Sequence, residues 1–133
     1  MRLPLALLVT LASTPALADP PASGWVIEVE LAAPKAAPMV ATLSVLPGEC
    51  AMGESSRPDE QLSLTVCHRK ESMGPEFNVA IDHSVQRGVD SNNRPVNVTR
   101  KLRVQARIAS EKRMVIGRLP SPEGFVVIGA SLR

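Results

Sequence analysis

The sequence is poor in aromatic residues. Among its 133 residues there is no Tyr, and only Trp25, Phe77 and Phe125 carry an aromatic ring. Carbohydrate clefts and single-strand nucleic-acid grooves are commonly built on stacking rings. The sequence therefore offers little for either kind of ligand, and we expect no nucleic-acid partner.

Candidate metal ligands and catalytic groups are also scarce. Two Cys and two His cannot form a four-ligand zinc site unless all four converge. His68 and His83 could bind a metal together with Asp82 or Glu71, but two His at unrelated positions are weak evidence. Asp82, His83 and Ser84 are the residue types of a hydrolase triad, yet neighbours on an extended chain point to opposite faces. We therefore expect no enzyme activity, no metal and no cofactor.

The N-terminus is typical of an export signal. Residues 1–18 combine one early basic residue, an apolar run over 3–12, and the small residues Ala16 and Ala18 at the positions that a signal peptidase reads. The run is too short to span a hydrocarbon core of about 30 Å, and no later run is long enough. We predict a signal peptide over 1–18 and an exported protein, periplasmic or secreted, without a transmembrane segment in its mature chain.

Export decides how the two cysteines are interpreted. Cys50 and Cys67 are the only pair, and exported proteins fold where disulfides persist. A reactive pair would favour a C-x-x-C spacing or a nearby base, and neither is evident. We predict one structural disulfide, which would stabilise the fold by about 3 kcal/mol for a loop near this length.

Alternation of apolar and polar residues is the main structural signal. Period-two alternation predicts half-buried strands, whereas a helix would repeat its apolar residues every three or four positions. The polar stretches 50–61 and 88–95 are expected to be loops. Strands are expected over residues 25–31, 39–46, 61–68, 77–82, 96–109, 113–119 and 125–132.

Seven short strands and no convincing helix predict an all-β fold. We expect a small antiparallel sandwich or a partly closed barrel of about seven strands. Residues 19–24 are expected to form a flexible leader, and residues 25–133 a single β-domain.

Charge is unevenly distributed along the chain. Residues 19–93 carry 5 basic and 11 acidic side chains, whereas residues 94–133 carry 9 basic and 2 acidic ones. On the strand expected over 96–109, Lys101, Arg103 and Arg107 project from one face as a basic stripe. Two interpretations stay open: the two halves pair within the molecule, or the stripe binds another protein or an anionic envelope surface.

One segment carries a family resemblance. Residues 94–119 read RPVNVTRKLRVQARIASEKRMVIGRL. They resemble the strand–turn–strand near the end of the conserved region of bacterial secretins, where an Arg/Thr-rich strand leads into a V-I-G-G-L-like strand. Here Arg118 stands where the second Gly is usual. The match covers 26 residues, and secretins are several times longer. The resemblance implies at most a small secretin-related envelope component.

These observations favour an exported, non-catalytic β-domain that binds a protein or an envelope surface through its basic stripe. The first alternative is an inhibitor or accessory subunit of a secreted enzyme, with 55–60 or 88–95 as the contact. The second is a metal-dependent or hydrolytic enzyme that uses His68, His83 and Asp82.

Overall fold

The structure is a computed structural model that describes residues 24–121 and 124–133. The predicted signal peptide and residues 19–23 of the predicted leader lie outside the described residues. Within the described ranges, no helix is long and apolar enough to cross a membrane. The strands are β1 (Trp25–Ala32), β2 (Met39–Val45), β3 (Cys50–Arg57), β4 (Glu60–His68), β5 (Glu76–Val89), β6 (Pro95–Arg107), β7 (Met114–Ser121) and β8 (Gly124–Leu132).

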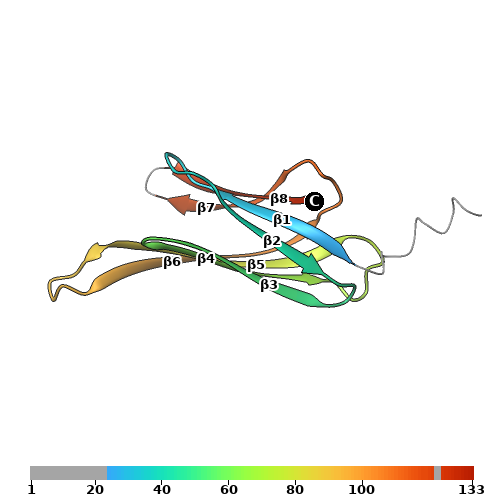
Figure 1. The fold of residues 1–133 in the computed structure, drawn as a ribbon, viewed down its shortest axis with the longest axis horizontal. Coiled ribbons are helices and arrows are strands. Elements are labelled where there is room, and N and C mark those ends of the chain that lie inside the picture. Colours follow the sequence, from blue (N-terminus) through green and yellow to red (C-terminus); the bar gives the residue numbers. More distant parts are fainter. Residues whose placement is uncertain (1–23, 122–123) are drawn as a thin grey trace, which may run out of the picture.

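The eight strands form two four-stranded sheets that lie face to face (Figure 1). We name the sheet with strand order β2-β1-β8-β7 sheet A and the sheet with order β3-β4-β5-β6 sheet B. All neighbouring strands are antiparallel. The predicted all-β antiparallel sandwich is therefore confirmed.

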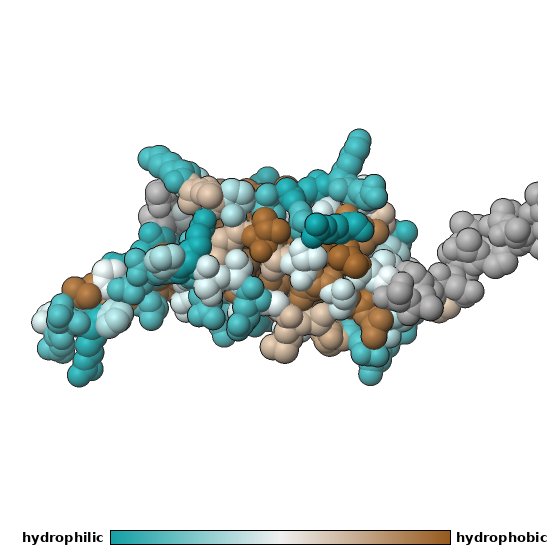
Figure 2. All heavy atoms as spheres, viewed as in Figure 1, coloured by the Kyte–Doolittle hydropathy of each residue, from teal (hydrophilic) through white to brown (hydrophobic). Residues whose placement is uncertain are grey.

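Period-two alternation explains how the sheets pack. In β1 and β2 the odd-numbered side chains are buried, whereas the even-numbered ones are exposed or half-buried. β4 and β5 send their own buried side chains toward the same core. In Figure 2, hydrophobic residues show in the central band of the molecule, and hydrophilic side chains cover most of its upper surface and the projecting tip.

β3 is an eighth strand that the sequence did not predict. The expected loop over 50–61 is wrong, because Cys50–Arg57 pairs along its length with β4. The two strands join through a turn at Pro58 and Asp59, and Asp59 has a φ of 66°. β3 is an edge strand with no buried side chain. Its residues therefore lack the apolar alternation that marks the other strands.

The hairpin of β5 and β6 is longer than expected. β5 continues past residue 82 to Val89, and only residues 90–94 separate it from β6. The end of this hairpin extends beyond sheet A (Figure 1). Sheet B therefore has no opposing sheet there, and Val89, Val96 and Val98 stay exposed.

The two sheets also approach each other along their edges. A Cβ at Gly53 of β3 would lie 3.1 Å from Leu43 Cδ2 of β2, across one side of the sandwich. On the other side, a Cβ at Gly117 of β7 would overlap the side chain of Leu102 in β6. Glycine at 117 therefore permits close approach of β7 to β6, although these strands are not hydrogen-bonded to each other.

Candidate binding face

The predicted basic stripe lies on the outer face of sheet B. Lys101, Arg103 and Arg107 are all exposed, as is Gln105 on the same face, whereas Leu102, Val104 and Ala106 are half-buried on the core side. Their shared face follows from the alternation of β6, as the sequence predicted. β6 is an edge strand, so the stripe runs along the border of the sheet.

Two residues of the stripe have acidic neighbours on β5. Arg103 Nη1 lies 3.3 Å from Asp82 Oδ1, and Arg107 Nη1 lies 3.6 Å from Glu76 Oε2. Lys101 has no ion pair among the described residues. Exposed ion pairs contribute only about 0–1 kcal/mol. A partner's carboxylates could therefore replace these contacts at little energetic cost.

Internal pairing between the acidic and basic halves also occurs on sheet A. The Arg113 guanidinium lies 2.6 Å from Glu28 Oε1 and 3.0 Å from Glu30 Oε2, and the two acids are neighbours on one face of β1. This contact joins residues more than eighty positions apart. Some of the acidic charge of residues 19–93 is therefore neutralised within the molecule by basic charge of residues 94–133.

A shallow depression adjoins the basic stripe. It has a volume of about 370 Å³, and its floor is formed by small side chains. Thr65 of β4, Ala80 of β5 and Arg103 of β6 are direct neighbours across the sheet. Met52 of β3 lies opposite Thr65 and is 77% exposed. The depression is lined by Thr65, Cys67, Asn78, Val79, Ala80, Arg103, Val104 and Gln105.

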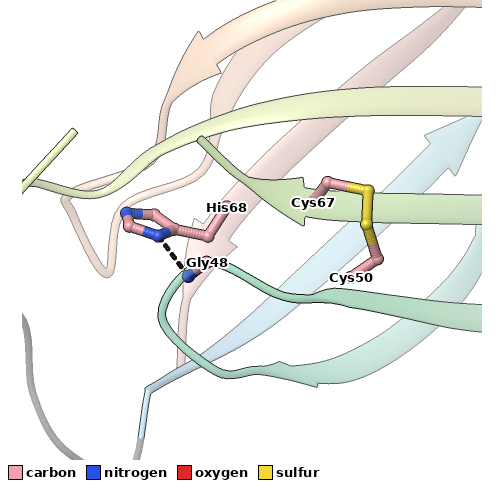
Figure 3. Close-up of a disulfide and its surroundings, with 4 residues drawn as sticks. All are labelled: Gly48, Cys50, Cys67 and His68. Atoms are coloured by element: carbon pink, nitrogen blue, oxygen red, sulfur yellow. Dashed lines mark hydrogen bonds between the residues drawn. A yellow bond between two sulfur atoms is a disulfide. The ribbon is translucent and has the colours of Figure 1, made fainter. Parts of the chain in front are cut away.

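The predicted disulfide borders this depression. Cys50 and Cys67 are bonded, directly opposite each other on β3 and β4, with their Cα atoms 3.9 Å apart (Figure 3). Cys50 is exposed and Cys67 half-buried, so the bond lies on the outer face of sheet B and not in the core. It holds together the ends of the two strands that are farthest from their connecting turn.

His68 is a buried structural residue. Its Nδ1 accepts a hydrogen bond of 2.8 Å from the Gly48 backbone N–H (Figure 3), so its Nε2–H donates to the Gly74 carbonyl at 2.8 Å. The ring packs against Trp25 and Phe77, with centroids 4.5 Å and 5.6 Å away. With both nitrogens engaged, neither is available to bind a metal.

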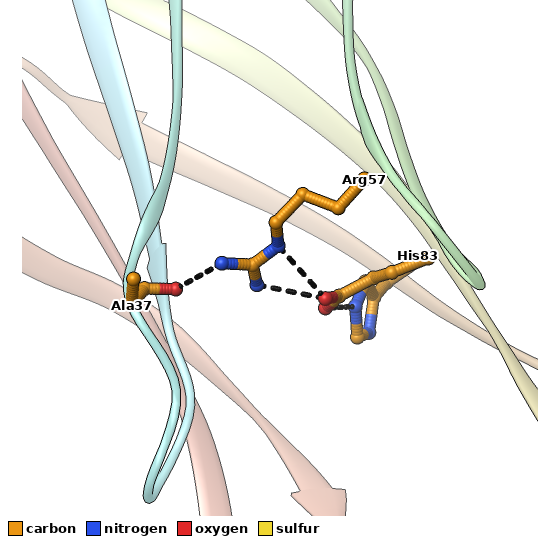
Figure 4. Close-up of polar contacts among 4 residues, drawn as sticks. Ala37, Arg57 and His83 are labelled. Carbon is orange, nitrogen blue, oxygen red and sulfur yellow. Dashed lines mark hydrogen bonds and ion pairs between the residues drawn. The ribbon is translucent and has the colours of Figure 1, made fainter.

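His83 belongs to a cluster at the opposite end of β4. Its Nε2 lies 2.6 Å from Glu60 Oε2, while Glu60 Oε1 accepts hydrogen bonds of 3.1 Å and 2.7 Å from Arg57 (Figure 4). Burial acts to raise the pKa of Glu60, but hydrogen bonds from His83 and Arg57, with their charges, outweigh it and hold the pKa below its ordinary value. His83 Nδ1 is buried without a hydrogen-bond partner among the described residues.

The structure does not bring the other candidate site residues together. His68 pairs with Phe77 and His83 with Leu62, so the two His lie six positions apart along these strands, roughly 20 Å. Asp82 points to the outer face and His83 to the core, as expected for neighbours on a strand. Within the described ranges, no group of three His, Cys, Asp or Glu side chains could hold a metal ion.

Sequence reasoning missed the cluster of Arg57, Glu60 and His83. Arg57 and Glu60 fell within a predicted loop, and His83 followed the predicted end of a strand. The one available signal was the continued alternation of Ile81, His83 and Val85, which places an imidazole at a core position.

The segment that resembles secretins runs from one sheet into the other. Its first strand is β6 of sheet B and its second is β7 of sheet A. Kinship with secretins stays a prediction.

No family model matches this chain, and no curated protein and no solved structure matches it either.

Proposed function

We propose that this chain is an exported, non-catalytic β-domain that binds an acidic partner protein through the outer face of sheet B. The observation that carries the proposal is the depression beside Arg103. It combines a hollow of about 370 Å³ with one basic lining residue, Arg103, which shares its strand face with Lys101 and Arg107. A partner could insert one side chain into the hollow while its carboxylates meet Lys101 and Arg103.

The chemistry of the hollow suits such an anchor. Binding energy in protein interfaces concentrates on a few side chains that fill pockets and exclude water. The methyl groups of Thr65 and Ala80, the disulfide and the exposed Met52 offer apolar contact. The basic border would add charge complementarity, which raises association rates and selects acidic partners.

A charge-reversal experiment tests this face. Lys101→Glu with Arg103→Glu would alter the binding face, while Lys112→Glu with Arg118→Glu makes the same charge change outside sheet B. Each tagged protein is used to capture partners from extracts of the source cells at low and high salt. We expect a salt-sensitive partner that the wild type and the control retain and the face variant loses. Equal retention by both variants would contradict the proposal.

A neutral substitution tests the contribution of the depression separately from that of the basic residues. Ala80→Gln fills the depression without changing the net charge, and we expect it to weaken capture of the same partner. Both face variants should keep a melting temperature close to that of the wild type, because the changed side chains lie on the outer face and exposed ion pairs contribute about 1 kcal/mol or less. Unaltered capture by Ala80→Gln would show that the hollow is not used.

An anionic envelope surface is the other predicted partner. Cosedimentation with vesicles that contain anionic lipid tests it directly. If the wild type and the control bind these vesicles, the face variant does not, and no protein is captured, the partner is the lipid surface.

The projecting end of the β5–β6 hairpin favours a second candidate function, as an inhibitor or accessory subunit. Asp90 Oδ1 accepts hydrogen bonds from the backbone N–H groups of Asn92 at 2.8 Å and Arg94 at 2.9 Å, which order the exposed tip. An ordered projecting loop loses little entropy on binding. Replacing residues 90–94 with a short Asn-Gly turn should abolish inhibition of a co-exported enzyme, if this function holds.

A further inference from the structure

A second cavity lies at the end of the sandwich from which the β5–β6 hairpin projects. Its volume is about 180 Å³, and it lies between the β1–β2 connection, strands β7 and β8, and the facing part of sheet B. Three of its lining residues are basic: Lys35 of the β1–β2 connection, Arg87 of β5 and Arg100 of β6. The other lining residues are Ala33, Pro34, Ala36, Glu60, Val85, Ser121 and Val126.

The charge of this cavity is not balanced within the described residues. Among the described residues, Glu60 is the one acidic residue that lines it, and both of its carboxylate oxygens are already engaged by Arg57 and His83. Lys35, Arg87 and Arg100 have no ion pair in the described part of the chain. Arg100 is half-buried, on the strand face that otherwise packs against the core, directly across from His83. Lys35 and Arg87 are exposed, so Arg100 is the one of the three that is partly removed from water, and a cation in that position favours a neighbouring anion.

The walls of the cavity are held in place before any ligand binds. Arg57 donates a hydrogen bond of 2.6 Å from Nη1 to the Ala37 carbonyl, so the β1–β2 connection is tied to the β3–β4 hairpin (Figure 4). Lys35 lies in the turn of the β1–β2 connection, where it has a φ of 61°. The chain thus places one basic residue of the β1–β2 connection beside the same cavity as two basic residues of sheet B.

We propose that this cavity binds the carboxylate of a short organic acid group. Its volume of about 180 Å³ lies below the range of about 300–1,000 Å³ that is typical of cofactor and drug-sized sites. The occupant is therefore a carboxylate with a few carbon atoms. The guanidinium groups of Arg87 and Arg100 suit a planar carboxylate, and Val85 and Val126 offer apolar contact to its carbon chain. The source is either a free short-chain acid or an acidic side chain of a partner protein.

The experiment uses NMR titration of the ¹⁵N-labelled exported chain at low salt with four probes. These are glutarate, its neutral analogue glutaramide, inorganic phosphate, and a blocked Val-Glu-Val peptide. We expect glutarate or the peptide to shift the backbone amide signals of Lys35, Arg87 and Arg100, and glutaramide to shift none. Binding by the peptide alone would identify a partner's side chain as the source, and binding by glutarate alone a free acid.

Matched variants test the assignment of the site. Arg100→Gln should weaken binding by about tenfold or more, because it removes a charge-assisted contact. Arg103→Gln, three positions along the same strand but on the outer face, should bind like the wild type. If Arg100→Gln does not fold, the exposed Arg87→Gln replaces it.

Three results would overturn the proposal. These are no shift by either carboxylate probe at about 50 mM, equal binding by the Arg100 and Arg103 variants, or equal binding of phosphate and glutarate. Since Arg103 belongs to the proposed protein-binding face, failure at one site leaves the other unaffected.

Discussion

Removal of the disulfide gives the sharpest test of how sheet B is held together. Cys50 and Cys67 are separated by 17 positions, and closing a loop of this size in the unfolded chain stabilises the folded state by about 3 kcal/mol. Because the bond lies on an exposed face, replacement of both residues by Ser leaves no cavity in the core. We therefore expect the double variant to lose about 3 kcal/mol of unfolding free energy.

The loss should also be distributed unevenly over the sheet. β3 buries no side chain and pairs with β4 alone, and at its disulfide end, away from the contacts of Arg57, the ladder and the disulfide are what hold it to the sheet. The bond joins the strand ends that are distant from the turn at Pro58 and Asp59. Without it, the amides of β3 should lose hydrogen-exchange protection well before those of β5, because edge segments with few apolar contacts open locally.

Trp25 reports global unfolding in this experiment. It is the one Trp in the sequence, and it is 8% exposed, in edge-to-face contact with Phe77 at 5.3 Å between centroids. Urea titration followed by its fluorescence gives the unfolding free energy, and hydrogen exchange gives the local openings. A loss below about 1 kcal/mol, with β3 protected as in the wild type, would refute the view that the disulfide holds this edge.

Three further predictions concern single residues. The pKa of Glu60 is lower in the folded state than its ordinary value of 4.5, so its ionised form contributes stability above that pH and loses it as the pH falls through the folded pKa. Glu60→Gln should therefore be less stable than the wild type near neutral pH, and urea titrations over roughly pH 3 to 7 should show this difference shrinking in acid. Gly117→Ala should cost about 1–2 kcal/mol through its overlap with Leu102, and adding Leu102→Ala should give a total loss smaller than the sum of the two single losses. Gly24 has a φ of 78°, and an added Cβ would overlap the Val45 carbonyl oxygen, so thermal unfolding of Gly24→Ala should show a loss of about 2 kcal/mol or more.

The predictable parts of the fold are those in which one strand face is buried. Trp25–Ala32 and Met39–Val45 were expected within one residue of their bounds, because each alternates with the period of the pleat. The same parity placed Lys101, Arg103 and Arg107 on one exposed face. The pairing of Cys50 with Cys67 followed from their number and the predicted export.

The missed parts depend on contacts between distant segments. β3 has the composition of a loop and becomes a strand because β4 offers it a hydrogen-bonding edge. No local pattern indicates that Arg57 would bind both Glu60 and the Ala37 carbonyl, or that Arg113 would bridge Glu28 and Glu30. These contacts exist only once the register of each sheet is set. The sequence alone shows that acidic residues dominate before about residue 94 and basic residues after it. It does not show which acidic residue pairs with which basic residue.

Strand β6 contributes residues to both proposed sites, one site on each of its two faces. Arg100 points to the core side, where it lines the end cavity, whereas Lys101 and Arg103 point to the outer face. Side chains on opposite faces of one strand share no partners here, because Arg103 contacts Asp82 and Arg100 lies across from His83. Effects of substitutions without shared partners add within about 0.5 kcal/mol. The combined variant Arg100→Gln with Arg103→Gln should therefore show the carboxylate affinity of the first change and the partner capture of the second. If the combined variant differs clearly from these two single variants in carboxylate affinity and in partner capture, the two sites form one binding surface.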